Sequence, residues 1–176
     1  YFVKEERIFS ACAAAAIYRR KVFEKIGYFD EQHFAYLEDM DIGFRARIYG
    51  YQNWFCPAAR VYHVGSGTSG SKYNSFKVKL SARNSVYMNY KNMPSGMLAV
   101  NFLPLLIGYL VKWGFFIRNG FGKDYGAGVL EGIRKRKKLR KVSFAFSRIW
   151  NYIEIEWELF RNCFLYVYEF IQRRVE

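Results

Sequence analysis

The chain has 176 residues, of which 52% are hydrophobic and 20% aromatic, enough for one well-packed core. Its net charge is +13, and residues 42–123 contain eleven Lys or Arg and no carboxylate, which suits an anionic partner such as lipid head groups, a diphosphate-linked sugar or nucleic acid. Cys12, Cys56 and Cys163 form neither a CxxC pair nor a zinc-binding spacing, which excludes a zinc module and predicts reduced thiols in the core.

The first predicted element covers residues 7–18 (RIFSACAAAAIY), which are apolar, rich in small side chains and bounded by charge. This composition fits a buried strand that lets another backbone or a ligand approach closely, although propensity alone would favour a helix for the alanine run. A short helix is predicted over residues 19–26 and ends at Gly27.

The densest group of carboxylates is Glu38, Asp39 and Asp41, at the predicted start of a helix over residues 38–49. Acidic side chains are favourable at a helix N-terminus, so Glu38 and Asp39 could cap the helix while Asp41 pairs with Arg45 four residues later. Large apolar residues surround these acids in the sequence, however, and such neighbours raise the proton affinity of a carboxylate, as a general base requires. Both interpretations stay open on residue chemistry alone.

Two short strands are predicted next, over residues 51–56 and 60–64, with His63 near the end of the second. An isolated histidine is more often structural than functional. A strand end beside the Gly/Ser segment 65–71 is nevertheless a position where ligands bind in open α/β sheets. That segment could be an inert linker, and we favour a cover that closes over a ligand and excludes water. His33 has no such context and is assigned to a loop.

A basic helix is predicted over residues 72–90, followed by a break at residues 92–96. Arg83 on this helix could meet a phosphate, or it could be an ordinary solvated arginine. Residues 97–117 are strongly apolar, but polar residues and a proline interrupt them, and a spanning helix needs ~20 apolar residues. We therefore predict a helix that lies in, or dips into, one leaflet.

The basic run RKRKKLRK at residues 134–141 supports a membrane surface, because each cation there contributes about 1 kcal/mol beside an anionic leaflet. A nucleic-acid patch has the same composition, but the neighbouring apolar helix and the lack of a recognisable nucleic-acid module argue against it. The glycines between residues 114 and 132 predict turns or close helix contacts. A last helix is predicted over residues 147–174, with an aromatic stripe typical of core or interface packing.

Three motifs, in this order, resemble the second half of the catalytic domain of family 2 glycosyltransferases. They are a Gly-Tyr-Phe-Asp-Glu turn at residues 27–31, a Tyr-x-Glu-Asp-x-Asp helix start at residues 36–41 and a Pro-x-Ala-x-Val-x-His strand at residues 57–63. The chain departs from the family in having Tyr28 where a second glycine is usual. Four residues of the next segment resemble an Arg-Asn…Lys-x-x-Pro arrangement found in rhamnosyltransferase-like members of the family, which is a weaker pattern. They are Arg83, Asn84, Lys91 and Pro94.

The resemblance implies an α/β fold class, in which residues 1–94 form the C-terminal part of a GT-A (nucleotide-diphospho-sugar transferase) domain. It implies that residues 7–18 are a strand passing behind the sugar site. Residues 95–176 would be a mostly helical, membrane-associating region at the cytoplasmic face. The family's D-x-D motif would lie N-terminal to this sequence, so we expect the isolated chain to have little activity.

The resemblance also implies an inverting reaction in which Asp39 removes the proton from an acceptor hydroxyl and Glu38 orients the acceptor or supports Asp39. His63 would help to hold a divalent cation (Mn or Mg) that stabilises the departing nucleoside diphosphate. Three further residues would bind substrate, namely Asp41, Arg45 and Arg83.

The implied partners are a nucleotide-sugar donor, a glycan or lipid-linked acceptor and an anionic membrane surface, with no nucleic acid. Two other classes of protein stay open. One is a non-catalytic membrane-surface adaptor whose acidic turn is structural, and the other is a nucleic-acid binder.

Overall fold

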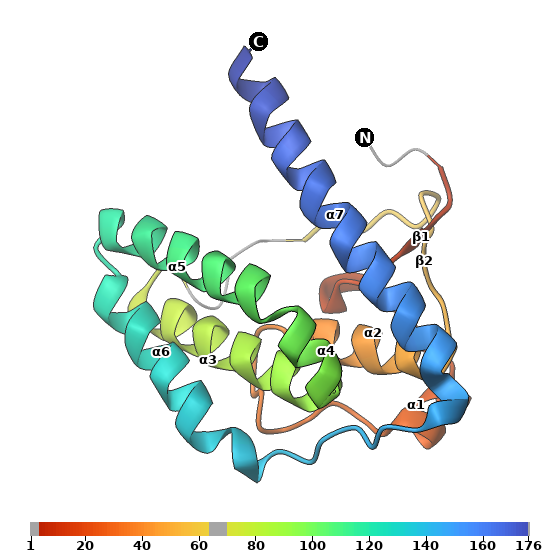
Figure 1. Cartoon of the computed structure of the whole chain (residues 1–176). Helices are drawn as coiled ribbons and strands as arrows, with labels where there is room; N and C mark the ends of the chain where they lie inside the picture. Colours follow the sequence, from red (N-terminus) through yellow and green to blue (C-terminus); the bar gives the residue numbers. More distant parts are fainter. Residues whose placement is uncertain (1–3, 64–69, 176) are drawn as a thin grey trace.

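The computed structural model describes residues 4–63 and 70–175, and these residues are mostly helical (Figure 1). The strands and helices follow in the order β1 (Glu6–Ile8), α1 (Arg20–Ile26), α2 (Glu38–Ile48), β2 (Asn53–Phe55), α3 (Ser75–Asn92), α4 (Ser95–Val100), α5 (Phe102–Arg118), α6 (Gly122–Lys135) and α7 (Ile149–Val175). Three single turns of 3₁₀ helix add η1 (Ala13–Ala15), η2 (Arg136–Lys138) and η3 (Phe146–Arg148).

The sheet consists of β1 and β2, paired antiparallel with Arg7 opposite Trp54. The prediction of one strand over residues 7–18 is therefore wrong for most of its length: the strand ends at Ile8, and the alanine run forms the exposed turn η1. With one neighbouring strand, the alanine run has no sheet face to pack against. β2 confirms the strand predicted over residues 51–56, whereas residues 60–63 form no strand, and the segment 64–69 lies outside the described residues.

The centre of the structure is α2, where every residue from Asp41 to Ile48 is buried. One face, with Ile42 and Ala46, packs against α1, and another, with Phe44 and Ile48, packs against the start of α7. Burial of each large apolar side chain contributes about 1.5–3 kcal/mol. The helices predicted over residues 19–26, 38–49 and 72–90 are confirmed as α1, α2 and α3.

The longest packed interface joins α3 to α6, which lie alongside each other (Figure 1). Gly128 and Gly132 make this possible, because a Cβ atom at Gly132 would lie 2.9 Å from the carbonyl oxygen of Arg83 and one at Gly128 would overlap the carbonyl of Lys79. The predicted close helix contacts are thus confirmed at these two glycines.

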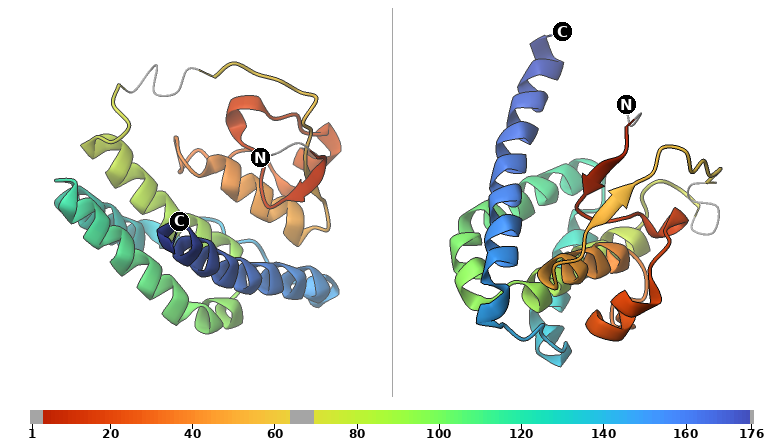
Figure 2. Two further views of the ribbon diagram at one scale, coloured as in Figure 1. Left: turned by 90° about the horizontal axis from the view of Figure 1, so that it is seen from above. Right: turned by 90° about the vertical axis from the view of Figure 1, so that its right-hand side faces the viewer.

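An outer layer is formed by α4, α5 and α7, which lie on the same side of the molecule in both views of Figure 2. The apolar helix predicted over residues 97–117 is split at Asn101 into α4 and α5, and α5 buries none of its residues. The last predicted helix is confirmed as η3 and α7. Within the described residues, none of the helices combines the length and apolarity needed to cross a bilayer.

One prediction about burial is wrong: Cys12, Cys56 and Cys163 are exposed, not core thiols. The stripe of α7 was predicted to pack in a core or an interface. Most of it faces outwards, with Ile153, Trp157, Phe160 and Phe164 exposed, so it does not lie in the core, and an interface stays a prediction. The α7 residues that reach the core, Tyr152 and Ile155, lie on the opposite face of the helix from this stripe.

Candidate active site

The turn that leads into α2 has an unusual backbone conformation. Phe34, Tyr36 and Leu37 have φ angles of 61°, 67° and 65°, and none of them is glycine. A non-glycine residue in the left-handed region costs about 1–2 kcal/mol, so contacts elsewhere must hold this turn. Such conformations in proteins gather at functional sites.

The contacts that hold the turn come from α3. The side-chain amide of Asn84, itself fully buried, donates to the carbonyl oxygens of His33 at 2.8 Å, Ala35 at 2.7 Å and Tyr36 at 2.7 Å. Arg83 adds donations to the carbonyls of Gln32 and His33, at 3.0 and 3.2 Å. The arginine predicted to bind substrate therefore supports the turn with its guanidinium group.

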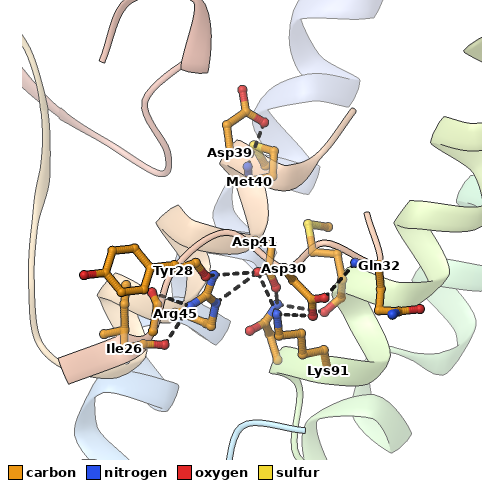
Figure 3. Close-up of polar contacts among 12 residues, drawn as sticks. Ile26, Tyr28, Asp30, Gln32, Asp39, Met40, Asp41, Arg45 and Lys91 are labelled. Carbon is orange, nitrogen blue, oxygen red and sulfur yellow. Dashed lines mark hydrogen bonds and ion pairs between the residues drawn. The ribbon is translucent and has the colours of Figure 1, made fainter. Parts of the chain in front are cut away.

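Asp41 anchors the first turn of α2 from inside the protein (Figure 3). It is 0% exposed, and its Oδ2 accepts from Arg45 Nε and from Lys91 Nζ, each at 2.9 Å. Its Oδ1 accepts from the Asn92 amide at 2.8 Å. Lys91 also donates to Asp30 at 2.7 Å, so one ammonium group bridges two carboxylates from different segments. We call these five residues the buried ion network.

Arg45 extends the network to the end of α1 (Figure 3). Its guanidinium donates to the carbonyl oxygens of Ile26 at 2.6 Å, Gly27 at 3.0 Å and Tyr28 at 2.8 Å. The last carbonyls of a helix lack intrahelical donors, and a cation there also complements the helix dipole. The ion pair with Asp41 that the structural interpretation predicted is present, and the polar atoms of both residues are bound by the protein itself.

The charges of the network stabilise one another. Burial alone would raise the pKa of Asp41, but Arg45, Lys91 and the Asn92 amide outweigh it, so its pKa lies below the ordinary value. The pKa of Asp30 is also lowered, because Lys91 and the backbone of Gln32 outweigh the effect of burial. Both carboxylates therefore stay ionised near neutral pH.

Asp39 lies two residues before Asp41, so it faces the opposite side of the helix (Figure 3). It is half-buried, its Oδ1 accepts from the Met40 amide at 2.8 Å, and its Oδ2 accepts from the Ala13 amide at 3.1 Å. Among the described residues it forms no ion pair. The Ser10 hydroxyl donates to its main-chain carbonyl at 2.6 Å. Main-chain amides therefore bind the Asp39 carboxylate, while none of the described cations pairs with its charge.

Gly43 explains how the segment around Ser10 reaches α2. A Cβ atom at Gly43 would lie 2.8 Å from the Cα atom of Ser10, so a side chain at this position would push the segment away from Asp39. The glycine in the middle of a helix, costly in isolation, thus has a packing reason.

Glu38 and Tyr18 complete the surroundings of Asp39. The Tyr18 hydroxyl and Glu38 Oε2 are both buried, and neither has a hydrogen-bond partner among the described residues. The pKa of Tyr18 is raised, first by burial and then by the negative charges of Asp39 and Glu38. Two enclosed polar atoms without a partner among the described residues thus lie near the Asp39 carboxylate. Tyr18 is absent from the predicted site, because the predicted strand over residues 7–18 gave no reason to turn its side chain towards Asp39.

His63 stands apart from the other predicted site residues. It is exposed, and no hydrogen bond or ion pair joins it to Glu38 or Asp39 in the part of the chain that the structure describes. Nor do any three His, Cys, Asp or Glu side chains of the described residues gather closely enough to hold a metal ion. One imidazole is not a complete cation site, so further ligands would have to come from elsewhere. The other histidine, His33, is a turn residue as predicted but is completely buried.

Comparison with known proteins gives a short match. A stretch of 52 residues is 38% identical to N-acetylglucosaminyl-diphospho-decaprenol L-rhamnosyltransferase of Mycobacterium tuberculosis, with the same values for strains CDC 1551 / Oshkosh and ATCC 25618 / H37Rv. It covers 30% of this chain and 17% of the relative, so the matched part spans about a sixth of that enzyme. The similarity supports a glycosyltransferase-like relationship. No family model matches the chain, and no solved structure matches it.

Proposed function

We propose that this chain is the C-terminal part of the catalytic domain of an inverting glycosyltransferase of the GT-A type. It would transfer a sugar from a nucleotide-diphosphate sugar to a hydroxyl of a glycan or lipid-linked acceptor, as in cell-surface polysaccharide synthesis. The observation that carries the proposal is Asp39: Ser10 binds its main-chain carbonyl and the Ala13 amide binds its carboxylate, but no cation of the described residues pairs with its charge. The glycosyltransferase-like match and the motif around Asp39 support the same class.

The proposed chemistry is a single displacement. Asp39 takes the proton of the acceptor hydroxyl as that oxygen attacks the anomeric carbon, and the bond from this carbon to the diphosphate breaks with its electron pair leaving on the nucleoside diphosphate. Glu38, with its unpartnered buried oxygen, orients the acceptor. The predicted divalent cation belongs to the proposal as a group that would neutralise the leaving diphosphate, with His63 as one ligand and the others outside the described residues.

The buried ion network and Asn84 act on this chemistry by positioning. Asp41 fixes the first turn of α2 from inside, and Asn84 fixes the preceding turn in its left-handed conformation. A base must lie within hydrogen-bond reach of the proton it removes, so a shift of this helix start would lower turnover even if Asp39 itself were unchanged. We therefore assign Asp41, Arg45 and Arg83 a positioning role in place of the predicted contact with substrate.

For localisation, we propose attachment to the anionic cytoplasmic face of a membrane through the outer layer. The exposed surface of α5 is almost wholly apolar, and the cations it carries are Lys112 and Arg118. The helix α7, which carries exposed aromatic residues, lies on the same side of the molecule as α5 (Figure 2). An apolar surface of this kind, with cations at its margin and a basic run nearby, suits a leaflet with anionic head groups.

The experiment for the catalytic proposal is the replacement Asp39→Asn in the intact protein. Sugar transfer from a nucleotide donor should fall by about 10²–10⁴-fold, the usual contribution of a general base, while circular dichroism stays unchanged. The matched control is Asp124→Asn, another acid in the first turn of a helix, which should keep its turnover. Normal transfer by the Asp39→Asn variant would show that Asp39 is not the base, whereas an intact protein that transfers no sugar but still binds the membrane would leave the adaptor interpretation in its place.

A further inference from the structure

A cavity lies on the network side of α2, and Asp39 is not among its lining residues. The cavity has a volume of about 460 Å³ and is bounded by the end of α1, the following turn and the linker between η2 and η3. This volume is in the range of sites for small molecules. Its lining includes six residues with polar side chains outside the network: Lys25, Tyr28, Tyr49, Arg140, Lys141 and Ser143.

The charges around this cavity do not balance. Arg45 and Lys91 also line it, but Asp41 and Asp30 neutralise them within the buried ion network. The other three cations, Lys25, Arg140 and Lys141, form no ion pair with any described residue. Three positive charges therefore converge on one cavity without a counter-charge from the described protein.

The walls of the cavity are fixed before any ligand binds. On one side, Arg45 holds three consecutive carbonyls at the end of α1. On the other, the amide of Val142 donates to the carbonyl of Lys91 at 2.9 Å, and Lys141 Nζ lies 4.6 Å from the ring centre of Tyr90. The linker is thus attached to α3 at Lys141 and at the next residue, Val142. Preorganised donors reduce the ordering cost of binding.

We propose that this cavity is a binding site for a phosphate-bearing ligand, with a diphosphate as the best match. Three cations suit a group with several negative charges, and cationic donors form charge-assisted hydrogen bonds to phosphate oxygens. Tyr28 and Ser143 line the same cavity, and their side chains carry hydroxyl groups that can act as neutral donors. The site contains neither Asp39 nor Glu38, so it stands whether or not the chain belongs to a transferase. The ligand is either a free diphosphate compound or the head group of an anionic lipid.

Binding of inorganic pyrophosphate, measured by isothermal titration calorimetry at low ionic strength, tests the site. The double variant Lys25→Gln/Arg140→Gln should bind at least about 10-fold more weakly, because two charge-assisted contacts are lost. The matched control is Lys137→Gln/Lys138→Gln, which removes two exposed cations of the neighbouring turn η2 that do not line the cavity. It should change the affinity by less than about 3-fold, as screened surface charges do.

Sedimentation with vesicles of phosphatidylcholine containing phosphatidylglycerol distinguishes a lipid head group from a free diphosphate. We call Lys25→Gln/Arg140→Gln the cavity variant and Lys137→Gln/Lys138→Gln the control variant. If the ligand is a lipid head group, the cavity variant binds these vesicles more weakly than the control variant does, and pyrophosphate competes with the vesicles. If the ligand is a free diphosphate, vesicle binding is equal for both variants while pyrophosphate affinity falls for the cavity variant. The proposal is overturned if both variants lose pyrophosphate and vesicle binding to the same extent, or if neither loses any.

Discussion

The region of α1 to α3 and the outer layer of α5 and α7 depart from the usual arrangement of polar and apolar side chains in opposite directions. In the first region, charged and amide side chains are inside: Asp41, Arg45 and Asn84 are at most 3% exposed. In the second, α5 buries no residue and α7 turns Trp150 and Trp157 outwards. Buried polar groups are stable only when they are fully hydrogen-bonded, so the hydrogen bonds of the first region hold its segments in one arrangement. Large exposed apolar surfaces mark interaction sites, so the second region is suited to contact with an apolar partner.

The comparison is sharpest at two Arg–acid pairs with identical spacing. Asp41–Arg45 and Arg20–Glu24 are both i,i+4 pairs with a nitrogen–oxygen distance of 2.9 Å, but the first is buried and the second is exposed. Asp41→Asn should lower the free energy of unfolding by about 3–5 kcal/mol, because Arg45 and Lys91 are left with uncompensated charge. Glu24→Gln should lower it by less than about 1 kcal/mol. Urea denaturation of both variants measures the difference, and equal effects would show that the network contributes no more than a surface pair.

The next largest effect is expected at Asn84. Asn84→Ala removes the donor for three carbonyls of the turn before α2, and an unsatisfied buried group costs about 1–3 kcal/mol. Amide hydrogen exchange of residues 33–37 should accelerate, because the left-handed conformations lose their support. Asn119→Ala is the control, since that exposed side chain bonds only to its own helix among the described residues. Unchanged exchange of the turn in Asn84→Ala would mean that the turn is held in another way.

The outer layer gives a smaller effect, measured in membrane binding. Ile107→Gln/Leu110→Gln places two polar side chains on the exposed surface of α5, where these residues are 52% and 53% exposed. Binding to vesicles with anionic lipid should fall by about 5- to 30-fold. The two aliphatic side chains are about half exposed, so only part of the free energy of moving them from water into the lipid is lost. The control Ile17→Gln/Val61→Gln changes two exposed aliphatic residues outside this layer and should bind normally. Equal binding of both double variants would exclude α5 as the docking surface.

The difference between the two regions also decides what the sequence could predict. α1, α2, α3 and α7 follow from local periodicity and stop signals, and Gly50 with φ of 82° ends α2 where it was expected. The Asp41–Arg45 pair was predictable because its spacing is local. The bond from Lys91 to Asp30 joins residues 61 positions apart, and it exists only because α3 lies against α2.

Predictions failed where the partner of a segment was not local. The aromatic spacing of α7 indicates one apolar stripe but not what the stripe contacts; the predicted core location is wrong, and the predicted interface is not tested by the isolated chain. Likewise, the run after β1 is composed like a buried strand, but in the described structure β1 has one neighbouring strand. Asp39 is a prediction from its motif, whereas the role of Asn84 in holding the turn required the tertiary structure.

The pH dependence of stability gives the smallest effect and again arises in the α1 to α3 region. Burial lowers the pKa of His33 below its ordinary 6.5; Asp41 and Asp30 oppose this shift, and Lys91 and Arg83 add to it. The unfolded chain therefore binds this proton more readily, and stability should fall as pH drops below about 6.5, by at most about 1.4 kcal/mol per pH unit. The free energy of unfolding should fall a second time below pH 3.8, the ordinary pKa of an aspartate. The pKa values of Asp30 and Asp41 are lowered in the folded state, so the stability they contribute is present above pH 3.8 and is lost as they become protonated.

The first of these falls is assigned to His33 by substitution. In His33→Leu, urea denaturation between pH 7 and 5 should give a flatter pH profile, because the titrating group is gone. The control His63→Leu removes the exposed histidine and should leave the slope as it was. If the free energy of unfolding of His33→Leu still falls with pH as steeply as before, other groups cause the pH dependence. That result would also mean that a proton can reach His33 in the folded protein, so that the interior behind the candidate site is more open than its complete burial indicates.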